Sequence, residues 1–132
     1  MGLVASQGLQ RLQNRGARIV LQVETSENTF QKLNWIKLKN RRIMHQCILV
    51  YKCINNYTPE YLQQYFLKKT HRNNTRRIDD IMLPKPKLEL FNKSFNYSGP
   101  FYFTSFLDNV KNAVSLNNFK TKIFNNFLTM NY

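Results

Sequence analysis

The chain contains few of the residues that mark secreted, membrane-spanning or disulfide-stabilised proteins. Only 2 of its 132 residues are cysteines, which excludes a disulfide framework. Its first residues lack the basic and then long apolar pattern of a secretion signal, and no apolar run reaches the length of a membrane span. We therefore expect an intracellular protein, nuclear or cytoplasmic, and do not expect a membrane partner.

Acidic residues are scarce as well. There are 7 Asp and Glu residues against 20 Lys and Arg, which gives a net charge of +13 and a pI near 10.1. A compact fold with so much charge of one sign repels itself unless a polyanion binds it. Nucleic acid is the first candidate for that polyanion, and an anionic membrane surface is the second.

The spacing of apolar residues predicts helices. An amphipathic helix with a basic back is expected over about 9–23, and a second one, apolar on more than one side and the best candidate for the core, over about 37–54. A third is expected over about 59–69, capped by Thr58 with Pro59 in its first turn. Ser115 is a good cap for a last helix. The apolar stripes of the first and last helices are Leu9, Leu12, Gly16, Ile19, Val20 and Val23, and Leu116, Phe119, Ile123 and Phe127.

These elements predict a mainly α fold of four to five helices around an irregular basic central loop, with room for one short strand pair near 81–83. The basic, proline-containing stretch 70–90 would separate a helical part, 1–69, from an aromatic cluster and C-terminal helix, 91–132. Periodicity does not decide between helix and strand for the aromatic cluster at 91–106.

Basic side chains are the candidate functional residues, because Lys and Arg neutralise phosphates while neighbouring aromatic rings stack on unpaired bases. Each basic cluster taken alone is typical of a solvated surface. Their number against so few acids favours binding of RNA or DNA. The predicted nucleic-acid-binding residues are Arg11, Arg15, Arg18, Arg41, Arg42, Lys52, Arg72, Arg76, Arg77 and Lys85.

A series of short motifs occurs in a characteristic order. They are LQNRGARIV (12–20), LKNRRIMHQ (38–46), YKCINNYTPEYL (51–62), NNTRRIDD (73–80), LPKPK (83–87), SFNYSGP (94–100) and SLNNFK (115–120). Together they resemble the region that follows the polymerase domain in reverse transcriptases of jockey-like non-LTR retrotransposons, over roughly residues 9–128. The resemblance implies the tail of an RNA-directed DNA polymerase whose catalytic modules lie outside this sequence.

The sequence departs from that family at one structural position. Where the family usually has Trp-Asn-x-Leu-Pro, this chain has Phe-Thr-Ser-Phe-Leu at 103–107, so a Trp anchor and a helix-ending Pro are both replaced. We expect the smaller ring to leave a void or a loosened helix end that costs about 1 to 3 kcal/mol.

Catalysis and metal binding have weaker support in the sequence than nucleic-acid binding does. Asp79 and Asp80 are adjacent, as in the two-metal turn of polymerases, but the aromatic residue of that turn is replaced by Arg77, and the further upstream carboxylate is missing. The groups His45, Cys47, Cys53 and His71 lack the close spacing of zinc ligands. We expect buried thiols, and neither enzyme activity, cofactor, metal nor small-molecule substrate.

Three functions remain open at this point. The first is a non-catalytic tail that binds RNA or DNA through its basic helices and loop, beside the polymerase domain of a parent element. The second is a structural segment that docks on the polymerase thumb without touching nucleic acid, which the all-round apolar stretch 43–54 favours. The third is a myristoylated peripheral protein, because Gly2 and Ser6 fit the acylation pattern and the arginines after them would add an electrostatic attraction to the membrane.

Overall fold

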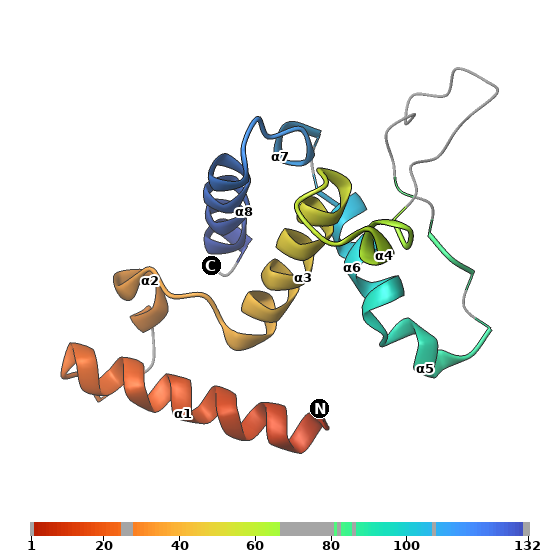
Figure 1. Cartoon of the computed structure of the whole chain (residues 1–132). Coiled ribbons are helices and arrows are strands. Elements are labelled where there is room, and N and C mark those ends of the chain that lie inside the picture. Colours follow the sequence, from red (N-terminus) through yellow and green to blue (C-terminus); the bar gives the residue numbers. More distant parts are fainter. Residues whose placement is uncertain are drawn as a thin grey trace. The chain divides into compact units, whose positions relative to one another are not determined.

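The computed structural model describes residues 2–24, 28–66, 81, 83–85, 87–106 and 108–130, and these are mainly helical, as predicted (Figure 1). No strand forms among these residues, and Ile81 makes only an isolated bridge. Three of the predicted helices correspond to the three longest ones, whereas the helix predicted over 59–69 corresponds to one of four residues, and most of the added helices span four or five residues. The helices are α1 (Leu3–Leu21), α2 (Thr29–Leu33), α3 (Leu38–Ile54), α4 (Glu60–Gln63), α5 (Glu89–Asn92), α6 (Phe95–Thr104), α7 (Asp108–Lys111) and α8 (Leu116–Met130).

The chain forms two compact units. One contains Met1–Arg42 and Phe124–Tyr132, and the other contains Ile43–Ile123. Helices α3 and α8 each contribute residues to both units. The expected division into 1–69, 70–90 and 91–132 stays a prediction, since all of 67–80 lies outside the described residues.

The predictions for α3 and α8 are confirmed. Helix α3 begins within one residue of the expected start and ends at Ile54 as expected, and Cys47, Val50, Tyr51 and Cys53 are buried along it. Ser115 caps α8 by accepting a hydrogen bond from the Asn118 backbone N–H at 3.2 Å. Phe119 and Ile123 of the predicted stripe are fully buried, and Phe127 is nearly so.

The prediction for the third helix is wrong in its length and its cap. Helix α4 ends at Gln63, because the chain tightens into turns that bring Phe66 into the core, where its ring meets Phe95 edge-on at 5.5 Å. Pro59, not Thr58, occupies the cap position. The hydroxyl of Thr58 is buried and has no hydrogen-bond partner among the described residues.

Helices α1, α2 and α3 end in the same way. A residue in the left-handed conformation closes each helix, and the next backbone N–H returns to a carbonyl five residues back, which satisfies one of the exposed carbonyls at the helix end. The expected break after Ile54 is confirmed by this geometry. The left-handed residues are Gln22 (φ 54), Asn34 (φ 52) and Asn56 (φ 62).

The core of the second unit is built on aromatic contacts. The ring of Tyr51 stacks on Phe119 with centroids 4.3 Å apart, and its hydroxyl donates a buried hydrogen bond to the Ala113 carbonyl at 2.7 Å. Phe103 packs against Phe119 from α6 at 5.9 Å. The aromatic cluster that periodicity left undecided is therefore helical, and it contributes one wall of this core.

Helix α6 reaches α3 through a glycine. A Cβ built on Gly99 would lie 3.0 Å from Cγ2 of Val50 and 2.8 Å from Cε2 of Phe95, so any larger residue would force these side chains to shift. Pro100 follows inside the helix and removes one backbone donor. Gly99 and Pro100 are both buried, and it is Gly99 that lies against Val50 of α3.

Candidate nucleic-acid interface

The basic face of α1 is the best-defined group of candidate residues. Arg11 and Arg15 are exposed and Arg18 is half-buried, and the helical repeat places the three on one side of the helix. Helix α1 carries no acidic side chain of its own. The arrangement therefore presents several guanidinium groups to solvent without a neutralising partner on the same helix.

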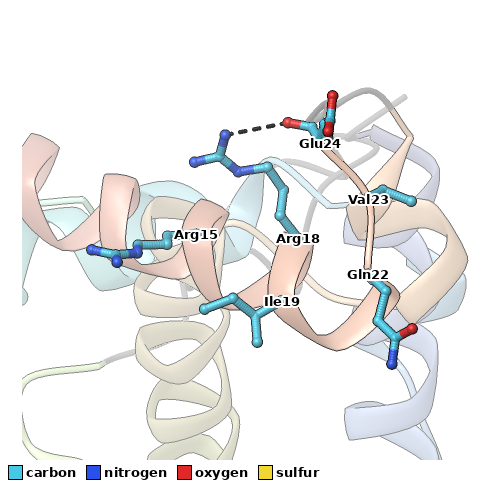
Figure 2. Close-up of a pocket in the computed structure, with 6 residues that line it drawn as sticks. All are labelled: Arg15, Arg18, Ile19, Gln22, Val23 and Glu24. Atoms are coloured by element: carbon cyan, nitrogen blue, oxygen red, sulfur yellow. Dashed lines mark hydrogen bonds between the residues drawn. The ribbon is translucent and has the colours of Figure 1, made fainter.

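An open hollow of about 490 Å³ lies at the C-terminal end of α1 (Figure 2). Arg18 donates a hydrogen bond to the backbone carbonyl of Glu24 at 3.5 Å, which draws its guanidinium toward the chain that leaves the helix. Arg15 extends from the preceding turn. The lining residues are Arg15, Arg18, Ile19, Gln22, Val23 and Glu24. Two cationic groups beside apolar Ile19 and Val23 suit a phosphate with an adjoining base or sugar.

The first turn of α3 adds two arginines within the same unit. Arg41 is exposed, while Arg42 donates to the Ser6 hydroxyl at 2.9 Å and to the Leu38 carbonyl at 3.4 Å. Arg42 thus has a structural role, and its contact with nucleic acid stays a prediction.

The remaining predicted residues belong to the second unit or lie outside the described residues. Lys52 is half-buried and Lys85 is exposed, and both belong to the second unit. Arg72, Arg76 and Arg77 lie outside the described residues, so the predicted role of the basic loop stays a prediction.

Sequence reasoning missed the contacts that orient α1. Gln10 accepts a hydrogen bond from the Leu38 backbone N–H at 3.1 Å, and Gln13 donates one to the Ile36 carbonyl at 2.9 Å. Gln10 also donates to Gln13 at 2.9 Å and to Asn14 at 3.0 Å. We call Gln10, Gln13 and Asn14 the amide clamp. It holds the entry of α3 and turns the polar side of α1 inward.

The apolar side of α1 consequently stays in solvent, although an apolar stripe on a helix ordinarily covers a core. Leu9 is 42% exposed, Leu12 is 64% and Ile19 is 67%. Ala17, on the clamp side, is the buried residue of this helix. Polar residues spaced three and four apart at 10, 13 and 14 were the available signal, but such residues usually face solvent.

The two cysteines are buried, as predicted from the sequence. Cys47 and Cys53 are both buried and unpaired, and burial raises the pKa of Cys47 to about 12. Such a thiol is protonated and unreactive at neutral pH. His45 is exposed, and no group of three metal-ligating side chains forms within the described part of the chain. His71, Asp79 and Asp80 lie outside that part.

Comparisons with known proteins do not assign this chain to a family. No protein-family model, curated protein or solved structure matches the chain. None of the helices formed by the described residues has the length and apolarity needed to cross a membrane.

Proposed function

We propose that this chain is a non-catalytic nucleic-acid-binding segment, related to the tail that follows the polymerase in non-LTR retrotransposon reverse transcriptases. Its partners would be RNA or DNA and the polymerase domain of the parent element. The order of the short motifs over residues 9–128 supports the relationship, and the excess of basic residues supports the partner class.

The arginines of α1 support the proposal more specifically than composition does. Arg11 and Arg15 project from a helix without acidic residues, and Arg15 and Arg18 line the hollow at its end. Guanidinium groups bind phosphate oxygens in a bidentate manner, and each phosphate contact releases counterions from the nucleic acid. Binding would start with the backbone of the nucleic acid and carry little sequence preference.

The test is a titration of the purified chain with single-stranded RNA and with duplex DNA between about 0.05 and 0.5 M salt. We expect affinity to fall steeply with salt. The double variant Arg11→Gln with Arg15→Gln should flatten the slope for single strands by about 1.4, the value for two lost phosphate contacts.

A matched control separates the effect of these arginines from the effect of net charge. Lys87→Gln with Lys93→Gln removes the same charge from two exposed residues of the second unit and should leave the slope nearly unchanged. The variant Arg76→Ala with Arg77→Ala tests the predicted loop in the same titration. Equal losses in the α1 variant and in the lysine control would reduce the effect to net charge and remove the assigned site.

Docking on a polymerase is the second candidate, and the structure changes the observation that favours it. The stretch 43–54 is apolar all round, but its buried residues Cys47, Val50 and Tyr51 belong to this chain's own core. The exposed apolar side of α1 now supports docking instead. This candidate predicts an isolated chain that aggregates or stays molten, and a sharp cooperative melt of a soluble chain would exclude it.

A further inference from the structure

The exposed apolar side of α1 has a regular spacing. Leu9, Leu12, Gly16 and Ile19 follow one another at intervals of three, four and three residues, and we call these four residues the α1 stripe. Intervals of three and four bring side chains to one line along a helix, which is the spacing of a helix–helix seam. Val20 beside them is 58% exposed, so the seam has an apolar flank as well.

Gly16 leaves a gap within the α1 stripe. A Cβ built on this residue would meet no atom within 4 Å, so nothing in the chain requires a glycine there. A glycine in the middle of a helix costs about 1 kcal/mol relative to alanine. A small residue on a helix surface does allow a second helix to approach closely, and the leucines next to it provide the apolar contact.

The intervals three, four and three read the same in both directions. When a second α1 lies antiparallel, Leu12 of each copy falls opposite Gly16 of the other, and Leu9 falls opposite Ile19. Each gap is thus filled by a leucine, and both halves of the contact are identical, as an interface with twofold symmetry requires. Arg11 and Arg18 lie away from the stripe by helical phase, so such a pair does not cover them.

We propose that the α1 stripe is a self-association surface, and that two copies of this chain pair through antiparallel α1 helices. A single helix pair lies at the small end of protein interfaces, so the dimer is weak and forms with rising concentration. Arg15 lies on the flank of the stripe, and each chain carries a net charge of +13, so the two copies repel each other at low salt.

Salt therefore acts on this contact with a characteristic sign. Added salt screens the repulsion between two like-charged copies and strengthens the apolar contact, so dimerisation rises with ionic strength. Association with an acidic helix, an anionic membrane or a nucleic acid weakens with ionic strength instead. The sign separates a second copy from these anionic occupants, and it is opposite to the sign expected for the proposed function.

The experiment is sedimentation equilibrium of the full chain over a concentration series at low and at high salt. We expect a monomer–dimer equilibrium that shifts toward dimer at high salt. Leu12→Ser should weaken the dimer by about tenfold or more, since it removes a buried apolar side chain from both copies. Leu3→Ser is the matched control, because Leu3 is 83% exposed on the opposite side of α1 by helical phase, and it should leave the equilibrium unchanged.

A second variant separates association from folding. Gly16→Leu places a favourable helix former in open space, so it should raise the melting temperature of the monomer while blocking the approach of the second Leu12. A chain that remains monomeric at all concentrations and salts would overturn the proposal, as would a dimer that Leu12→Ser leaves intact. Binding to vesicles of phosphatidylcholine and phosphatidylserine that Leu12→Ser abolishes, in an otherwise monomeric chain, would assign the stripe to a membrane and also overturn it.

Discussion

Gly99 and Gly16 are both helical glycines, but their surroundings give them opposite roles. A Cβ on Gly99 would approach Val50 and Phe95 within 3.0 Å, whereas one on Gly16 would meet nothing within 4 Å. The ring of Phe95 is held against Phe66, so it has little freedom to move aside. One glycine is therefore required by packing, and the other is not required by anything in its own chain.

We predict opposite effects on stability for the same substitution at these two positions. Gly99→Ala should lower the free energy of unfolding by about 1 to 3 kcal/mol, because overpacking outweighs the better helix propensity of alanine. Gly16→Ala should raise it by up to about 1 kcal/mol, because propensity acts there alone. Urea denaturation of both variants at a concentration where the chain is monomeric measures the two effects. A stabilising Gly99→Ala would show that α6 does not approach α3 as closely as described.

The Cys47 thiol gives a pH dependence whose sign follows from its burial. Its pKa rises from 9.0 to about 12 because burial disfavours the thiolate, so the folded state keeps its proton longer than the unfolded state does. Stability from this group is then fully present below pH 9.0 and is lost as the pH rises toward about 12. The pKa of Tyr51 is raised as well, by burial and by Tyr57, and it acts in the same direction.

We therefore predict that the melting temperature falls between about pH 9 and pH 11, and that Cys47→Ala shows a shallower fall than the native chain. Alkylation provides an independent check. Iodoacetamide at neutral pH should leave both buried cysteines unmodified until urea unfolds the chain. Rapid labelling of Cys47 in the folded chain would contradict its burial. An equal alkaline slope with and without this thiol would instead assign the fall to other groups.

At the scale of the element, α1 is held by hydrogen bonds where a helix is ordinarily held by apolar contacts. Gln10 caps the start of α3, whose first backbone donors have no partner within their own helix. We predict that Gln10→Ala lowers stability by about 1 to 2 kcal/mol, the usual cost of a lost helix cap. Gln7→Ala is the control, since Gln7 is exposed one turn earlier on the same helix. Thermal melts of the two variants should differ by that amount, and equal melts would show that the amide clamp does not hold α3.

The elements also show where sequence reasoning works. The start and end of α3 and the Ser115 cap of α8 follow from local patterns, because a run of apolar positions and a capping side chain act within a few residues. The short length of α4 does not follow from local patterns, because the ring that packs on Phe66 is Phe95, which lies far along the chain. The inward orientation of the α1 amides could not be predicted for a related reason, since their hydrogen-bond partners, Ile36 and Leu38, lie outside α1.

One part of the candidate site could be predicted from the sequence, and another part could not. Arg11, Arg15 and Arg18 share one side of α1, as helical periodicity predicts, because that relation is contained in the helix itself. The hollow beside Arg15 and Arg18 does not follow from periodicity. It depends on the left-handed conformation of Gln22, which redirects the chain at the helix end. Glutamine at such a position gives no signal, whereas the asparagines that close α2 and α3 do.

At the scale of the whole molecule, the net charge of +13 opposes folding, because like charges repel one another in the compact state. We predict that the melting temperature of the monomer rises between about 0.02 and 0.5 M salt, because screening reduces that repulsion. At low salt a single-stranded oligonucleotide should raise the melting temperature by binding the folded state, and at high salt this increment should disappear, since phosphate contacts weaken with salt. Scanning calorimetry with and without the oligonucleotide measures both effects. A melting temperature that falls with salt would mean that attractive charge pairs outweigh the repulsion in the folded chain, and would contradict this prediction.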